Sequence, residues 1–159
     1  NSTMNIENEC SFQYNSGHFP LFQISGSKSI VSLNDTIFSD NQFDDSMVKC
    51  SYSNINIYNA QFNNTQSKNS VIMGSNSKIF IKNSRFLRSW SSSIFGSFCK
   101  IYVLNSTFEK SESLNQISIY SINSTNIQII DSYFNDFSLS CQLKLNGTVS
   151  LNNLVFNSI

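Results

Sequence analysis

The sequence predicts an all-β protein, a right-handed parallel β-helix solenoid with about six turns of 22–26 residues. Two observations predict this fold: a Phe recurs at similar steps along the chain, and a short alternating apolar pattern precedes most of these residues. The recurring residues are Phe12, Phe38, Phe62, Phe86, Phe108, Phe134 and Phe156. We expect residues 1–159 to form a single β-helix domain that is a fragment of a longer solenoid.

The alternating pattern reads apolar-x-apolar-x-Asn/Asp-x-x-Phe, as in Ile55, Ile57, Asn59 and Phe62. Because successive side chains of a strand point to opposite faces, this period of two indicates a strand with one buried face. Strands are therefore expected near residues 31–33, 55–57, 79–81, 101–103, 127–129 and 149–151. The residues Phe38, Phe62, Phe86, Phe108, Phe134 and Phe156 are expected to stack in the core.

A second apolar position follows each Phe by nine residues and predicts a second, shorter strand in each turn. It is occupied by Leu21, Met47, Val71, Phe95, Ile117 and Leu143. Apolar residues at helical spacing are missing from the sequence, so no helix is expected.

The Asn or Asp three residues before each Phe predicts a ladder, since stacked turns place equivalent residues about 4.8 Å apart. Its members are Asp35, Asn59, Asn83, Asn105, Asp131 and Asn153. They share the parity of the inward apolar pair. We therefore expect them to be buried inside a bend, with each side chain bonded to its neighbours above and below.

The composition separates this chain from several classes of protein. Ser and Asn make up roughly a third of the residues, and ten Lys and Arg balance ten Asp and Glu. This balance argues against nucleic acid as a partner. No apolar run approaches the roughly 20 residues of a membrane-spanning helix, so no membrane segment is expected in this chain. Phe and β-branched residues recur throughout, unlike in disordered Ser/Asn-rich segments.

In turn length, in the Ile-x-Ile-x-Asn pattern and in the stacked Phe, the repeats resemble those of the right-handed parallel β-helix superfamily. That superfamily includes pectate lyases and surface proteins of bacteria and protists. The resemblance covers almost the whole chain and implies the architecture rather than an activity. The Asn/Ser-rich repeats are also similar to large surface or fibre proteins of protists.

Few residues could support an enzyme. His18 is the single histidine, which argues against a Ser-His-Asp arrangement and most His-based metal sites. The densest acidic group, Asp40 with Asp44 and Asp45, is expected in a solvated turn rather than around calcium. Arg85 and Arg88 flank Phe86, and no acidic partner is expected at matching positions of adjacent turns. No catalytic residue, metal ligand or cofactor is predicted.

Asn-x-Ser/Thr sequons occur at Asn1, Asn34, Asn63, Asn105, Asn123 and Asn146. If the chain is secreted, each can accept an N-glycan where its side chain is accessible. We expect glycans on Asn34, Asn63, Asn123, Asn146 and Asn1. We expect none on Asn105, because a ladder residue should be buried.

The four cysteines, Cys10, Cys50, Cys99 and Cys141, could form disulfides by their even count. Counted from the preceding Phe, Cys50 lies twelve residues on and Cys99 thirteen, so only these two are expected to share a phase. Two turns separate them by about 9.6 Å, beyond the roughly 7 Å that a disulfide allows between Cα atoms. Buried free thiols are expected.

Outward positions six and four residues before the Phe should be polar, yet several carry apolar or aromatic residues. These are Tyr58, Phe80, Tyr102, Leu104 and Ile130. A contiguous apolar stripe of this kind marks a contact surface for another chain or a glycan. Cover by loops or glycans is the alternative explanation.

Together these features favour a non-catalytic structural segment of an extracellular, N-glycosylated fibre, coat or surface adhesin. Self-association into a filament, or stacking on more turns of the same chain, would use the solenoid ends or the aromatic stripe. A polysaccharide is a further expected ligand. The alternative function is a carbohydrate-active β-helix enzyme, a polysaccharide lyase or hydrolase, or a glycan-binding module.

Overall fold

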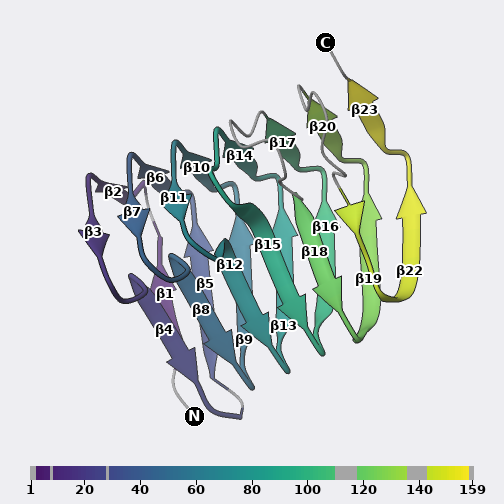
Figure 1. The fold of residues 1–159 in the computed structure, drawn as a ribbon, viewed down its shortest axis with the longest axis horizontal. Helices are drawn as coiled ribbons and strands as arrows, with labels where there is room; N and C mark the ends of the chain where they lie inside the picture. The colour runs from purple at the N-terminus through teal and green to yellow at the C-terminus, as the bar shows by residue number, and fades with distance from the viewer. Residues whose placement is uncertain (1–2, 8, 28, 110–117, 136–142, 158–159) are drawn as a thin grey trace.

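The structure, a computed structural model, describes residues 3–7, 9–27, 29–109, 118–135 and 143–157. The regular structure of these residues is β-strand throughout, in parallel sheets stacked as a solenoid of about six turns. The predicted fold class is confirmed, and Figure 1 shows the turns following one another along the long axis. No helix that could cross a membrane occurs among the described residues.

Sheet A collects the strand that the alternating pattern predicts in each turn. Its order is β1-β5-β9-β13-β16-β19-β22. The bounds are β1 (Thr3–Ile6), β5 (Ile30–Asn34), β9 (Asn54–Tyr58), β13 (Lys78–Lys82), β16 (Lys100–Leu104), β19 (Ser124–Ile130) and β22 (Gly147–Asn152). Equivalent residues pair across turns, as Ile79 does with Ile55 and Ile101.

Sheet B follows sheet A in each turn and carries the recurring Phe. Its strands are β2 (Ser11–Gln13), β6 (Ile37–Ser39), β10 (Gln61–Asn63), β14 (Arg85–Leu87), β17 (Thr107–Glu109), β20 (Tyr133–Asn135) and β23 (Val155–Asn157). Phe62 pairs with Phe38 on one side and with Phe86 on the other.

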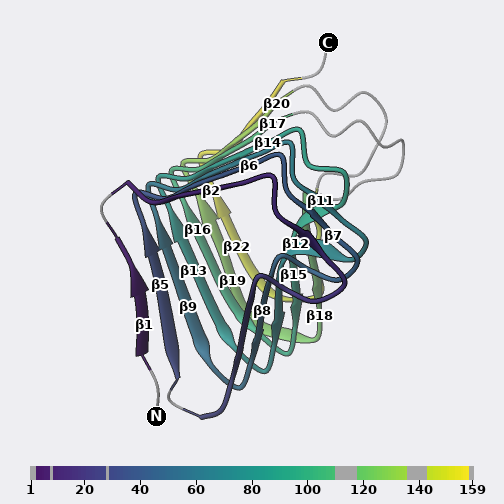
Figure 2. The ribbon, with the colours of Figure 1, turned by 90° about the vertical axis from the view of Figure 1, so that its left-hand side faces the viewer.

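Two further sheets complete the turn. The short sheet C contains β3 (Ser16–Gly17), β7 (Gln42–Phe43) and β11 (Gln66–Ser67). Sheet D contains β4 (Phe22–Ser25), β8 (Val48–Ser51), β12 (Ser70–Ser75), β15 (Ser92–Ser97), β18 (Ile119–Ile122) and β21 (Leu143–Lys144). Figure 2, seen from the end of the stack, shows the turns superimposed around a common interior.

A column of Phe rings runs through that interior. The ring centroids of Phe62 and Phe86 are 4.6 Å apart with planes inclined by 5°, and those of Phe86 and Phe108 are 5.0 Å apart. In the inner turns, the inward apolar residues of sheet A and those of sheet D are buried as well. The column extends from Phe12 to Phe156, so one ring per turn links all of the turns.

Apart from the first corner, where Glu9 has a φ of 60°, each corner from sheet A to sheet B contains a residue with a φ between 44° and 53°. These residues are the ladder members Asp35, Asn59, Asn83, Asn105, Asp131 and Asn153. Asn and Asp enter this left-handed region more readily than other residues that carry a Cβ. Nδ2 of Asn83 donates to Oδ1 of Asn59 at 3.2 Å, and Nδ2 of Asn105 donates to Oδ1 of Asn83 at 3.0 Å. Asn59 and Asn153 donate in the same way to Asp35 and Asp131.

The expectation that these ladder residues are buried is wrong. All six are exposed, because the left-handed residue interrupts the two-residue alternation of the strand and directs its side chain outward. The buried position of the corner passes to the next residue: Thr36, Ala60, Ser84, Ser106 and Ser132. The corner therefore has an outer amide ladder and an inner row of small, mostly hydroxyl-bearing side chains.

The corner from sheet D to sheet A repeats this arrangement with other residue types. Tyr52, Asn76, Phe98 and Asn123 have φ between 49° and 55°, and each precedes a buried residue: Ser53, Ser77, Cys99 and Ser124 respectively. The inner row is again bonded to the backbone, since the amide of Ser53 donates to Oγ of Ser77 at 3.3 Å and that of Cys99 to Oγ of Ser124 at 3.3 Å. Two aromatic residues thus occupy a conformation that favours Gly or Asn.

The second apolar position shifts in the turn that contains Phe95. Phe86 pairs with Phe62, 24 residues earlier, but Ser92 pairs with Ser70, 22 residues earlier. Two residues are therefore absent just before β15, and counting nine from Phe86 overshoots the buried position. Phe95 instead pairs with Met73 on the outer side of sheet D. Ile117, another residue of this series, lies outside the described residues.

The same shift changes the row that Cys99 occupies relative to Cys50. Cys50 pairs with Gly74, whereas Cys99 follows Gly96 by three residues and lies in the row of Ser77. The expectation that Cys50 and Cys99 share a position is wrong. Both are buried free thiols, and Cys10 is a half-buried one. Cys141 lies outside the described residues.

The last turn presents core positions to solvent. Val149, Leu151 and Phe156 pair with Ile127, Ile129 and Phe134, which are fully buried. The three residues of the last turn are 39%, 49% and 52% exposed. Strands β22 and β23 are each paired on one side.

Candidate functional site

The outer surface of sheet A carries the predicted aromatic stripe. The ring centroids of Tyr58 and Phe80 are 5.5 Å apart, and those of Phe80 and Tyr102 are 6.3 Å apart. Leu104 pairs with Ile130 in the next strand. All five side chains are half-buried. We call this set, Tyr58, Phe80, Tyr102, Leu104 and Ile130, the aromatic face.

The aromatic face occupies two adjacent outward rows of the sheet, with Phe80 and Tyr102 in one row and Tyr58, Leu104 and Ile130 in the other. Tyr58 pairs with Lys82, while Phe80 pairs with Asn56 and Tyr102, so the first ring belongs to a neighbouring row. Nζ of Lys78 lies 5.9 Å from the centroid of Phe80 and 5.3 Å from that of Tyr102. The ammonium group of Lys78 therefore interacts with both rings and forms a polar edge beside the apolar side chains.

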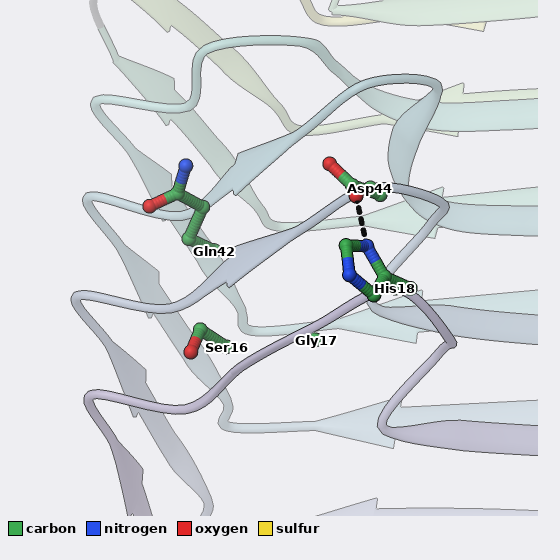
Figure 3. A pocket seen from close by; sticks show the side chains of 5 residues that line it. All are labelled: Ser16, Gly17, His18, Gln42 and Asp44. Carbon is green, nitrogen blue, oxygen red and sulfur yellow. Dashed lines mark hydrogen bonds and ion pairs between the residues drawn. The ribbon is translucent and has the colours of Figure 1, made fainter.

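A shallow pocket lies on sheet C, lined by Ser16, Gly17, His18, Gln42 and Asp44 (Figure 3). Nδ1 of His18 contacts Oδ2 of Asp44, and Nζ of Lys68 lies 2.8 Å from Oδ1 of the same carboxylate. His18, Asp44 and Lys68 are spaced by 26 and 24 residues, the steps of the Phe column in these turns. Counting by those steps would have found this stack, which sequence reasoning missed.

The pocket brings Ser16, His18 and Asp44 onto neighbouring turns. A general base must lie within about 2.6–3.2 Å of the hydroxyl that it deprotonates. Ser16 makes no hydrogen bond to His18 among the described residues, and Figure 3 shows its side chain directed away from the imidazole. The His18 side chain is 86% exposed. The arrangement can bind a polar or charged group at the surface.

The neighbouring acidic residues are neutralised by lysines. The hydrogen bond from Lys68, followed by that from His18, lowers the pKa of Asp44. The hydrogen bond from Lys49 to Asp45 at 2.8 Å lowers the pKa of that carboxyl. Within the described part of the chain, no three His, Cys, Asp or Glu side chains gather as a metal ion would require.

Arg85 has no acidic residue at the matching position of the next turn, where it pairs with Thr107, as expected. Its Nη2 nevertheless lies 3.3 Å from Oε1 of Glu109, two residues further along β17. Both side chains are substantially exposed, so the pair contributes little to stability. Arg88 has a φ of 53° and stands at the corner that leaves sheet B.

The sequon asparagines differ in the state of Nδ2, the atom that a glycan would use. That of Asn34 donates to Oε1 of Glu7 at 3.2 Å, and that of Asn105 donates to Asn83. Asn105 is exposed, so burial does not protect it. The side chains of Asn63, Asn123 and Asn146 make no hydrogen bond to other described residues. Asn1 lies outside them.

Comparisons with known proteins identify no relative: no protein-family model matches the chain, and no curated protein matches it.

Proposed function

We propose that this chain is a non-catalytic structural segment of an extracellular, N-glycosylated fibre, coat or surface adhesin. The observation that carries the proposal is the aromatic face, with three rings in sequence on a regular sheet. Contiguous apolar surface of this kind marks a protein contact. The partner that we propose is a second copy of this chain, because a regular stack of turns offers the same face at a fixed spacing and can pair with itself.

The solenoid ends offer a second route of assembly. The exposed core positions Val149, Leu151 and Phe156 support stacking on another turn, from the same chain or from a second copy. Unpaired strand edges favour this kind of addition. End stacking would extend a filament, while the aromatic face would join filaments side by side.

N-glycans belong to the same proposal. Asn63, Asn123 and Asn146 offer an unbonded Nδ2, and we propose them as the occupied sequons. Glycosylation replaces one of the two Nδ2 hydrogens, so a glycan on Asn34 would leave one hydrogen for its bond to Glu7. A glycan on Asn105 would likewise leave one for its bond to Asn83 in the outer ladder.

A carbohydrate-active enzyme is the second candidate, favoured by the contact between His18 and Asp44 in the sheet C pocket. Polysaccharide turnover that is lost on His18→Ala and on Asp44→Asn would support this candidate. Polysaccharide turnover that is lost on Asp45→Asn or on Arg88→Ala would also favour the enzyme over the structural proposal.

Sedimentation equilibrium of the chain secreted from eukaryotic cells tests the aromatic face. The double variant Phe80→Ser, Tyr102→Ser should weaken self-association by about tenfold or more, since buried interface aromatics commonly contribute over 1 kcal/mol each. Tyr133→Ser is the matched control, because Tyr133 is 45% exposed on sheet B. Equal association of all three proteins would contradict the proposed contact.

A further inference from the structure

A second surface, on a different sheet from the aromatic face, forms a groove across sheet D. It is lined by Lys68, Asn69, Met73, Ser92, Phe95 and Tyr120. Met73, Phe95 and Tyr120 occupy the same row in β12, β15 and β18. The groove therefore has an apolar floor three turns long, and its polar residues lie on the segments that enter β12 and β15.

The two rings of the floor meet at a steep angle. The centroids of Phe95 and Tyr120 are 5.3 Å apart with planes at 69°. Nζ of Lys144 lies 5.0 Å from the centroid of Tyr120. All three floor side chains are half-buried, so part of each remains available to a ligand. Phe95 lies here because the turn is two residues short, which moves it from the expected second apolar position to the outer row.

Two of the lysines around the groove are already paired, whereas Lys144 forms no ion pair with the described residues. Lys68 is bonded to Asp44 at 2.8 Å and Lys49 to Asp45 at 2.8 Å. Nδ2 of Asn69 donates to Oδ1 of Asp45 at 2.8 Å, which leaves its amide carbonyl as an acceptor. The Oγ of Ser92 makes no hydrogen bond to other described residues. The groove therefore offers neutral donors and acceptors at its margin.

We propose that this groove binds a pyranose ring of a neutral carbohydrate. A pyranose has an apolar C–H face that fits against aromatic rings, and hydroxyls at its rim that fit amide and hydroxyl partners. An anionic sugar would have to compete with Asp44 and Asp45 for Lys68 and Lys49, and would meet only Lys144 outside an ion pair among the described residues. The groove lies on sheet D and the aromatic face on sheet A, so this site does not depend on self-association.

Saturation-transfer NMR tests the site with cellohexaose, laminarihexaose, mannohexaose and maltohexaose, and with hexagalacturonate as the anionic comparator. At least one neutral oligosaccharide should bind, with saturation of its ring C–H protons. Tyr120→Ala and Phe95→Ala should each lower the affinity by about tenfold, a loss equivalent to about 1.4 kcal/mol. Tyr133→Ala on sheet B should leave the affinity unchanged.

Asn69→Ala provides a second test that leaves the floor intact. It should lower the affinity several-fold, and circular dichroism should show the same strand content as the parent chain. The proposal is overturned if no neutral oligosaccharide binds, if hexagalacturonate binds more tightly than all of them, or if both Tyr120→Ala and Asn69→Ala bind like the parent. Failure here would leave the sedimentation result for the aromatic face unaffected.

Discussion

Oγ of Ser84 accepts a hydrogen bond from the backbone amide of Ala60 in the preceding turn, at 3.2 Å. The same hydroxyl donates to the carbonyl of Lys82 at 2.9 Å. Ser106 and Ser132 repeat this pair of bonds, so the inner row of the corner satisfies backbone groups that the bend removes from the sheets. One small side chain thus stabilises the corner through hydrogen bonds to the backbone of two successive turns.

Ser84→Ala should therefore destabilise the chain by about 1–3 kcal/mol, the cost of leaving a buried amide without an acceptor. Urea unfolding followed by circular dichroism measures the change. Ser51→Ala is the matched control on the half-exposed outer side of sheet D, where the expected change is within about 0.5 kcal/mol. Equal free energies of unfolding for the two variants would show that the inner row is dispensable.

Phe86→Ala should be far more costly than Phe156→Ala. Phe86 is 1% exposed between two other rings of the column, while Phe156 is 52% exposed in the last turn. Removal of a buried Phe costs about 3–5 kcal/mol through lost burial and the cavity that remains. The melting temperature of each variant checks the difference. Similar losses at the two positions would contradict the burial gradient along the column.

Phe98→Asn should stabilise the chain. Phe98 has a φ of 55° and is 54% exposed, so its side chain adds strain with little burial in return. Asn76 and Asn123 occupy the equivalent corner positions of the adjacent turns. The expected gain is about 0.5–1 kcal/mol. Phe98→Val, which keeps the strain at a β-branched residue, should instead lower the free energy of unfolding, and a gain from both variants would count against this explanation.

The stability of the fold should fall at high pH through Cys50. Burial raises the pKa of this thiol to about 12 from its usual 9.0. The neutral thiol is favoured in the folded state, so the contribution is complete below pH 9 and is lost as the pH rises toward 12. Urea unfolding at pH 7, 9 and 11 should show a steeper decline for the parent chain than for Cys50→Ala. Parallel curves would mean that Cys50 does not contribute to this decline.

The strands of sheet A could be predicted from sequence because their alternation repeats every two residues. Those of sheet B could be predicted because each contains the recurring Phe. The corners could not. The parity of Asn83 places it inside, but its left-handed conformation turns it outside and transfers burial to Ser84. A positive φ is a property of backbone geometry that alternation does not encode.

The sites on sheets C and D were harder still to predict. The position of Phe95 depends on a two-residue shortening before β15, which counting forward from Phe86 does not reveal. The contact between His18 and Asp44 joins residues 26 positions apart, in a sheet whose strands have two residues each. Such short strands leave no alternating pattern of their own, so their stacked side chains can be found only by counting along the chain from the recurring Phe.

A cryo-electron microscopy map of the secreted, glycosylated chain in its assembled form tests the proposed function most directly. The structural proposal predicts filaments in which Phe80 and Tyr102 are buried against a second copy, with glycan density at Asn63, Asn123 or Asn146. Isolated single-chain particles, with the aromatic face open to solvent and no glycan at these residues, would contradict it.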